Sequence, residues 1–316
     1  MISVEKYQKD QNHIWNKFVE NSKNGTFLLD RNYMDYHSDR FIDNSLMFYK
    51  DEELIALLPA NLKDQTLYSH QGLTYGGLVM SNKIKASQVL EIFDHLINYL
   101  RSINITKLIY KKIPYIYHRY PAEEDLYALF RNNAILFRRD IATVIDMRKR
   151  MGFSKSKKCG LSKAKQNNLL VKKSDDLQSF LAIEEEVLKQ HNAKPVHSRE
   201  ELSALMNNFP DNIKLFASFK DNAMVAGVII FKESEIVHLQ YMANSSLGME
   251  MGGLDIIIQY LLDQEYKNKQ YFDFGISTEQ QGRYLNEGLI SQKEMFGGRA
   301  VCYDQYELNI INDPLS

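Results

Sequence analysis

The chain has 316 residues, 44% hydrophobic and 25% charged, which is typical of a folded globular protein with room for two domains of ordinary size. No apolar stretch approaches the roughly 20 residues that span a bilayer, and the first ten residues carry charges where a signal peptide needs an apolar segment. The two cysteines, Cys159 and Cys302, lie far apart without the spacing of a metal site. We therefore expect a cytoplasmic protein with no membrane span and no bound metal.

The net charge is only −1, but the basic residues are concentrated in one segment. Residues 148–173 contain ten lysines and arginines and no acidic residue, so 29 basic residues remain against 40 acidic ones elsewhere. A basic segment in an acidic protein is typical of contact with an anionic partner. A solvated connection between two domains would have the same composition, and the sequence leaves both interpretations open.

In the first half, the pattern predicts helices at 15–19 and 33–36, followed by a hairpin of apolar strands at 48–60. Apolar residues at i, i+3 and i+4 spacing, among them Val89, Phe93 and Leu96, then predict an amphipathic helix over 88–100. Strands are expected at 107–112 and 141–147, the second of them closing the first half.

The second half repeats this order at an offset of 170 residues. Residues 218–230 can be laid on 48–60, because each segment has an apolar strand, a Lys-Asp turn and a second apolar strand. The other predicted elements are helices at 177–190, 200–206 and 254–262 and strands at 270–275 and 301–309, with Ser198 as an N-cap. An antiparallel meander followed by a strand–helix–strand crossover gives a mixed sheet with helices on both faces. We expect an α/β fold of two tandem domains, residues 1–147 and 148–316.

The turn before helix 254–262 is a better candidate for a donor site than the corresponding turn in the first half of the chain. A helix that begins where two strands separate presents unpaired N–H groups to a phosphate or a carbonyl, and glycines allow the backbone to approach a ligand closely. A plain tight turn before a helix would contain the same glycines. The candidate cofactor-binding residues are Tyr241, Met242, Ser245, Gly248, Met249, Gly252 and Gly253.

Polar residues around the strand at 270–275 are the candidates for catalysis. Asp273 interrupts an apolar strand, where an unpaired carboxylate is costly, and Glu279 follows at the carboxyl end, where open α/β sheets bind ligands. Tyr284 comes shortly after, and Lys293 precedes a Gly-Gly turn. The alternatives are that Asp273 caps the following turn and that Lys293 is a surface lysine. His191 and His197 lack a third ligand, so we expect surface or helix-end roles for them.

Three blocks of the chain together resemble the FemAB-like branch of the GNAT superfamily. They are the basic stretch 157–171, Asp273-Phe-Gly with Ser277 and Glu279, and the block 288–298. The resemblance implies paired GNAT domains that transfer an acyl group from a thioester or an aminoacyl ester to an amine, with the donor in the C-terminal domain and an N-terminal domain that shapes the acceptor cleft. It matches Lys293 to a lysine that contacts the donor and places Asp273 and Glu279 at the acceptor cleft.

Two features depart from that pattern. The turn at 245–253 lacks the leading Gln or Arg of the superfamily's pyrophosphate turn, which weakens coenzyme A as the donor. The chain also has no long helical arm of the kind found in aminoacyl-transferring members, which weakens a tRNA donor.

The expected function is an N-acyltransferase that moves an acyl group from acyl-CoA, such as acetyl-CoA, to an amine. The acceptor is a small molecule, such as an amino sugar or another precursor in polysaccharide or cell-envelope biosynthesis. Asp273 or Glu279 would act as base and Tyr284 as acid, while backbone N–H groups of 239–242 would polarise the carbonyl. Alternatives are an aminoacyl-tRNA-dependent peptidyl transferase, with tRNA on the basic segment, and a non-catalytic ligand-binding protein. The sequence identifies neither the acceptor nor the oligomeric state.

Overall fold

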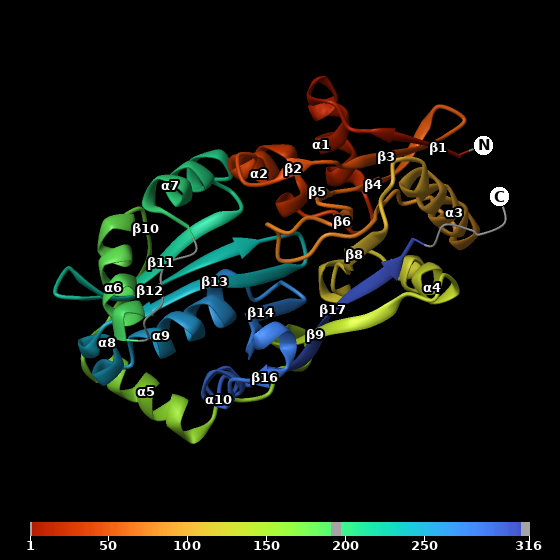
Figure 1. Ribbon diagram of the computed structural model, residues 1–316. Coiled ribbons are helices and arrows are strands. Elements are labelled where there is room, and N and C mark those ends of the chain that lie inside the picture. Colours follow the sequence, from red (N-terminus) through yellow and green to blue (C-terminus); the bar gives the residue numbers. More distant parts are fainter. Residues whose placement is uncertain (1, 191–196, 311–316) are drawn as a thin grey trace. The chain divides into compact units, whose positions relative to one another are not determined.

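The structure is a computed structural model that describes residues 2–190 and 197–310 (Figure 1). The chain divides into two compact units. Unit 1 contains the residues up to Asp140, Gln281–Arg283 and the residues from Cys302 onward, and unit 2 contains Ile141–Gln280 and Tyr284–Val301. Among the described residues, no helix combines the length and the apolar character that crossing a membrane requires.

Unit 1 is built from two sheets with helices. One sheet has the strand order β1 (Ile2–Lys6), β3 (Leu46–Lys50), β4 (Glu53–Leu58), β7 (Val79–Met80). The other has the order β17 (Arg299–Asn309), β8 (Lys107–Lys111), β6 (Thr66–Tyr68), β5 (Asn61–Lys63), β2 (Ile42–Asp43), and β6 and β8 run parallel. The helices are α1 (Asn12–Asn21), α2 (Arg31–Met34), α3 (Ala86–Ser102) and α4 (Glu124–Arg131).

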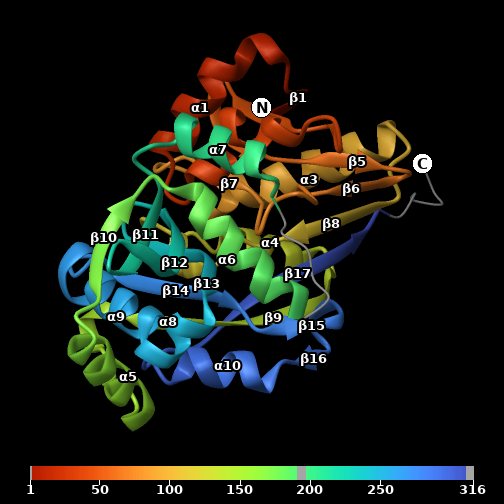
Figure 2. The same ribbon diagram turned by 90° about the vertical axis from the view of Figure 1, so that its left-hand side faces the viewer.

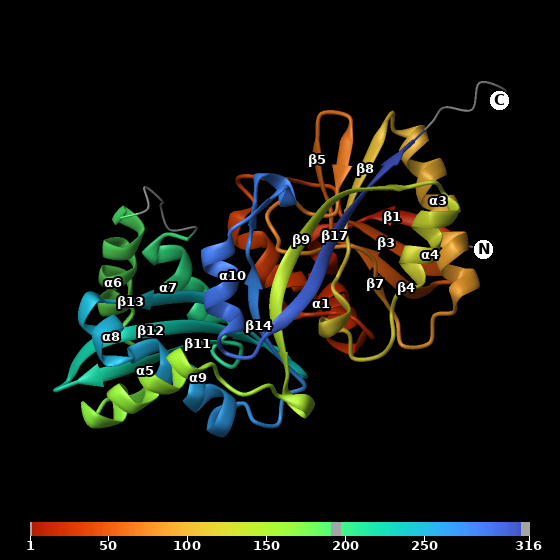
Figure 3. The same cartoon turned by 90° about the horizontal axis from the view of Figure 1, so that it is seen from below.

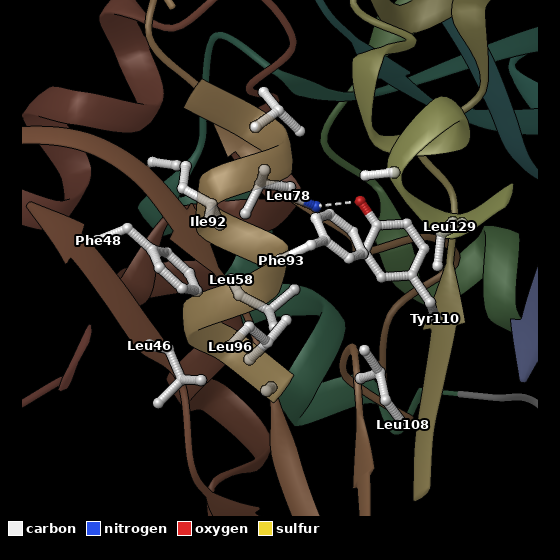
Figure 4. Close-up of a cluster of buried hydrophobic side chains, with 14 of the residues drawn as sticks. Leu46, Phe48, Leu58, Leu78, Ile92, Phe93, Leu96, Leu108, Tyr110 and Leu129 are labelled. Carbon is white, nitrogen blue, oxygen red and sulfur yellow. Dashed lines mark hydrogen bonds between the residues drawn. The ribbon is translucent and has the colours of Figure 1, made fainter. Parts of the chain in front are cut away.

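The core of unit 1 forms around α3, which confirms the amphipathic helix predicted at 88–100. Its buried residues Val89, Ile92, Phe93, Leu96 and Leu100 follow the helical period and join one apolar cluster with residues of β3, β4 and β8 (Figure 4). The hydroxyl of Tyr110 lies inside this cluster, where it accepts from the backbone N–H of Leu78 at 2.6 Å and donates to Asp125 at 2.6 Å. The buried hydroxyl is therefore fully satisfied, as burial requires.

Unit 2 contains one mixed sheet between helices. Its strand order is β10 (Leu170–Ser174), β11 (Ile213–Lys220), β12 (Ala223–Lys232), β13 (Ile236–Asn244), β14 (Tyr271–Ile276) and the unit 2 part of β9 (Ile135–Asp146). A short hairpin joins β15 (Thr278–Glu279) to β16 (Tyr284–Leu285). The helices are α5 (Lys155–Gln166), α6 (Leu177–Gln190), α7 (Arg199–Asn208), α8 (Ser246–Met251), α9 (Gly253–Tyr260) and α10 (Glu287–Glu294).

Helices cover both faces of the unit 2 sheet. The ring of Phe180 in α6 fills the space beside Gly227 of β12, whereas Gly253 of α9 packs on the neighbouring residue Ala226. Adjacent residues of a strand point to opposite faces, so α6 (Figure 2) and α9 cover different faces. The predicted helix 177–190 is confirmed, and Ser198 caps α7 as predicted by accepting from the backbone N–H of Glu201.

The predicted repeat is confirmed by the β3–β4 and β11–β12 hairpins. At the offset of 170 residues, the cross-strand pair Phe48/Ala56 corresponds to Ser218/Ala226, and in both hairpins the register shifts at the next residue. Both residues of each turn have positive φ, 48° and 68° in unit 1 and 47° and 68° in unit 2. Two positive φ values define a type I′ turn, which matches the twist of the strands it joins.

The unit 1 turn places Glu52 in a backbone conformation that disfavours it, with φ at 68°. The left-handed region costs most residues about 1–2 kcal/mol, whereas glycine enters it freely. We expect Glu52→Gly to raise the free energy of unfolding by about 1 kcal/mol in urea titrations. The matched change Asn222→Gly in unit 2 should raise the free energy of unfolding by less, because asparagine tolerates the left-handed region. Equal gains at both positions would contradict the explanation.

The closing strands correct one expectation. We expected 141–147 to close the first half and 301–309 to close the second. Instead, residues 142–146 of β9 pair with β14 in unit 2, and residues 305–309 of β17 pair with β8 in unit 1. The apolar pattern of a strand shows that it is buried but does not show which neighbour it pairs with. The domain boundary at 147/148 stays a prediction, since both units draw on distant parts of the chain.

Candidate active site

Strands β13 and β14 separate at one pair of polar residues. They pair in parallel from Ile236/Tyr271 to His238/Asp273, and β13 then continues to Asn244 without β14 beside it. At this last pair, Nδ1 of His238 lies 2.7 Å from Oδ2 of Asp273. Asp273 is 0% exposed, and its Oδ1 accepts from the backbone N–H of Gly275 at 2.7 Å. The costly buried carboxylate thus has a partner on each oxygen.

Lys293 of α10 supports the end of β14. Its ammonium donates to the carbonyl oxygens of Gly275 at 3.0 Å and Ile276 at 2.7 Å, and the residue is 4% exposed. Burial lowers the pKa of Lys293 to about 8, although the nearby charge of Asp273 opposes that shift. Gly275 has a φ of 72°, and β14 leaves its register with β9 after Asp273. Lys293 therefore holds the backbone where β14 bends.

Glu279 and Tyr284 lie opposite each other on the β15–β16 hairpin, which follows β14 in the chain. Both side chains are exposed, and Oε1 of Glu279 accepts from Asn286 at 2.8 Å. Between this hairpin and β14 lies Ser277, which is 1% exposed and whose hydroxyl has no hydrogen-bond partner among the described residues. The structure thus joins Asp273 and Lys293 closely and places Glu279 with Tyr284 as a separate, exposed pair.

Strand β13 is irregular beyond His238. Its register with β12 shifts between the pairs Ile230/Leu239 and Ile229/Tyr241, which is a β-bulge of the kind that re-aims backbone groups near active sites. Tyr241 contacts Nδ1 of His197 through its hydroxyl, with the two rings edge to face, and Met242 is half-buried. His197 therefore links the start of α7 to β13, whereas His191 lies outside the described residues.

The chain itself occupies the space beside the glycines of the predicted donor turn. A Cβ on Gly248 would lie 2.3 Å from the carbonyl oxygen of Val225, and one on Gly252 would lie 2.1 Å from that of Gly160. Gly253 packs on Ala226. The hydroxyl of Ser245 caps α8 by accepting from the backbone N–H of Gly248 at 3.0 Å. Packing thus accounts for these glycines, and the N–H of residue 248 is already bonded.

Helices α5, α8 and α9 lie together in unit 2 (Figure 3). With α10 they line a pocket of about 630 Å³. Three lysines and one aspartate line it, together with Met249 and Asn244, whose buried Oδ1 has no hydrogen-bond partner among the described residues. Lys157 pairs with Asp255 at 2.8 Å. Lys155 and Lys163 are exposed and form no ion pair within the described parts of the chain. The pocket therefore offers two ammonium groups to an anion.

The sequence pattern alone does not reveal two parts of this site. His238 was overlooked because only the parallel pairing of β13 with β14 brings it to Asp273, 35 positions away. A polar residue within an apolar strand was the available signal, and it was used for Asp273 alone. Lys155 and Lys163 were noted only as members of the basic segment, and their position beside Asn244 follows from the packing of α5 on α8 and α9.

Comparison with solved structures identifies the fold. FemX matches with a TM-score of 0.69 over 98% of each chain at 11% identity. L-PGS from Bacillus licheniformis matches with a TM-score of 0.62 at 14% identity, over 96% of this chain and 92% of that one. A tandem GNAT protein from the clavulanic acid biosynthesis pathway matches with a TM-score of 0.50 at 10% identity, over 99% of this chain and all of the other. The chain has the FemAB-like tandem GNAT fold.

No family model and no curated protein sequence matches the chain. At these low identities the FemAB-like tandem GNAT fold is shown by structure alone. The predicted fold class and the resemblance noted in the sequence are confirmed. Within the fold, two features of this chain are candidates for a functional site. They are the separation of β13 from β14 and the basic pocket.

Proposed function

We propose that the chain is an N-acyltransferase that moves an acyl group from acyl-CoA to the amine of a small acceptor, such as an amino sugar or another polysaccharide or cell-envelope precursor. The lysine pocket carries this proposal, since it joins the turn after β13 to the basic helix α5. Lys155 and Lys163 would hold phosphate groups there. Because Ser245 already binds the backbone N–H of Gly248, phosphate contacts would come from lysine side chains more than from the glycine turn.

The separation of β13 from β14 supports the chemistry of this proposal. Past His238, β13 has no parallel neighbour among the described strands, and its register with β12 shifts at residues 239–241. Backbone N–H groups of this bulge could polarise an acyl carbonyl. An amine that attacks a thioester needs positioning and the removal of a proton more than covalent help. Asp273, Glu279, Tyr284 and Lys293 remain our candidates for the polar groups of this site.

An aminoacyl-tRNA donor is the second candidate, and one observation favours it. Helix α5 carries further exposed lysines outside the pocket, Lys158 and Lys165, so its basic surface extends along the helix. Binding of tRNA through phosphates would weaken steeply with added salt. Transfer from charged tRNA, together with no transfer from acetyl-CoA, would replace the first proposal with this one.

The two cysteines offer a direct test of the donor pocket. Cys159 lines it, whereas Cys302 belongs to unit 1, and both are exposed. We expect acetyl-CoA to slow the alkylation of Cys159 by iodoacetamide and to leave that of Cys302 unchanged, as measured by peptide mass spectrometry. No protection at millimolar acetyl-CoA would contradict the proposed donor. Protection without release of free coenzyme A in the presence of amines would indicate a non-catalytic ligand-binding protein.

Charge reversal in the pocket should weaken donor binding. We expect Lys155→Glu and Lys163→Glu each to raise the acetyl-CoA concentration that half-protects Cys159 by about tenfold, the equivalent of one charge-assisted contact of about 1.4 kcal/mol. Lys158→Glu makes the same charge change on the same helix outside the pocket, so it should shift the value by less than about twofold. Equal effects of all three variants would indicate that the net charge of the helix weakens binding, and that Lys155 and Lys163 do not form a specific binding site.

A further inference from the structure

Among the described residues of unit 1, the position equivalent to the His238–Asp273 pair is occupied by Tyr68 and Ile109. The two units build the same parallel strand pairing, since Tyr68/Ile109 ends the pairing of β6 with β8 as His238/Asp273 ends that of β13 with β14. Tyr68 and His238 also match at the repeat offset of 170. Tyrosine and isoleucine thus satisfy the fold at this position, and the imidazole–carboxylate pair is an addition in unit 2.

The geometry defines how the imidazole is held. An ionised carboxylate can only accept hydrogen bonds, so Nδ1 of His238 donates its proton to Asp273 across 2.7 Å. That bond leaves the lone pair on Nε2 and fixes the orientation of the ring. The histidine side chain keeps 14% of its surface exposed while Asp273 keeps none. Of the two residues, only the histidine reaches solvent.

Resting on the proposed transferase function, we propose that His238 is the general base that takes a proton from the acceptor's ammonium group, and that Asp273 is its positioning residue. Asp273 has both oxygens engaged and no exposed surface. The ammonium of Lys293, bound to the carbonyls of Gly275 and Ile276, lies at the same strand end.

The proton and bond changes balance without a further reactant. Nε2 of His238 accepts one proton from the ammonium, and the resulting amine attacks the acyl carbon. A carbon–nitrogen bond forms and the carbon–sulfur bond of the thioester breaks, while a second proton passes from the attacking nitrogen to the departing sulfur. The imidazolium then returns its proton to water. The products are an amide, a free thiol and one proton in solution.

Two substitutions of His238 separate a catalytic role from a structural one. His238→Asn keeps an N–H donor near the position of Nδ1 and has no atom in place of Nε2, so it keeps Asp273 bonded while removing the base. We expect kcat for acetyl transfer from acetyl-CoA to an amino sugar such as glucosamine to fall by about 10²–10⁴-fold, the scale of general-base catalysis. Protection of Cys159 by acetyl-CoA should persist, which shows that the variant is folded and binds donor. His13→Gln, at an exposed position of unit 1, should match the wild type.

Asp273→Asn tests the positioning role with a readout that does not depend on activity. In the wild type, the ¹⁵N NMR signals of His238 should indicate a proton on Nδ1. An asparagine can donate to the ring, so the variant should move the proton toward Nε2 and lower kcat with little change in KM.

The outcomes are separable. Wild-type turnover in His238→Asn would overturn the base assignment while leaving the transferase proposal intact, and an unchanged tautomer in Asp273→Asn would overturn the positioning role. A wild type that transfers no acyl group to any amine would overturn the transferase proposal, and the base assignment with it.

Discussion

Replacing Lys293 with methionine is expected to lower the free energy of unfolding by about 2 kcal/mol at pH 7 and to reduce kcat by about 100-fold. The change removes the donor to two buried carbonyls, which costs about 1–3 kcal/mol for each group left unpaired. Removal of a desolvated ammonium offsets part of that loss. The kinetic effect follows because a small displacement of the Gly275 backbone moves the groups bonded to Asp273.

The difference in free energy of unfolding between the wild type and Lys293→Met should increase with pH. Burial lowers the pKa of Lys293 to about 8 from an ordinary value of 10.5, so between these values the unfolded chain binds more protons than the folded one. Stability therefore rises with pH in this window. As pH increases from about 8 to 10.5, the wild type should gain up to about 3 kcal/mol relative to Lys293→Met, measured in parallel urea titrations. A constant difference across this range would contradict the lowered pKa of the buried Lys293.

Lys111 of unit 1 provides a matched control. Its ammonium also donates to two backbone carbonyls, those of Gln71 at 3.1 Å and Leu73 at 2.8 Å, and burial likewise lowers its pKa to about 8. Lys111→Met should therefore show a similar loss of stability and the same direction with pH, but it should leave acyl transfer unchanged. A loss of transfer in both variants would mean that Lys293 affects activity only through stability.

The sequence predicts structure that depends on neighbouring residues, such as turns and hairpins. It does not predict which distant segments pair with each other. The two hairpins were predicted together with their turns because a Lys-Asp turn between apolar strands acts over a few residues. The sequence pattern did not predict strands β1 and β10, since each is short and pairs with residues 40 or more positions away. The exchange of closing strands between the units was missed for the same reason.

In the candidate site, too, the sequence indicates individual residues but not the distant residues that they contact. Asp273 was selected because a carboxylate in an apolar strand must have a partner, but the sequence did not show that the partner is His238. The glycines at 248, 252 and 253 were interpreted as room for a ligand, although close contacts with Val225, Gly160 and Ala226 also require them. A glycine pattern shows that something approaches the backbone closely and does not show whether it is a ligand or the chain.

Gly252→Ala provides the test of that packing role, and we expect it to lower the free energy of unfolding by about 4 kcal/mol. Gly252 has a φ of 80°, where a side chain costs about 1–2 kcal/mol, and a Cβ would lie 2.1 Å from the carbonyl oxygen of Gly160 in α5. Backbone atoms cannot rotate away as a side chain can, so α5 must shift from α8 and α9. Because the same helices line the lysine pocket, protection of Cys159 by acetyl-CoA should be lost as well.

Gly288→Ala is the control for this variant, since it adds the same methyl group to a glycine of α10 at an ordinary φ. The nearest atom, Oδ1 of Asn286, would be 3.7 Å away, so the change should stabilise the helix by about 0.5 kcal/mol. If Gly252→Ala instead matches the wild type in stability and in Cys159 protection, the α5 contact does not require glycine. Wild-type stability combined with lost Cys159 protection would make close approach of a ligand to the backbone the better explanation for Gly252.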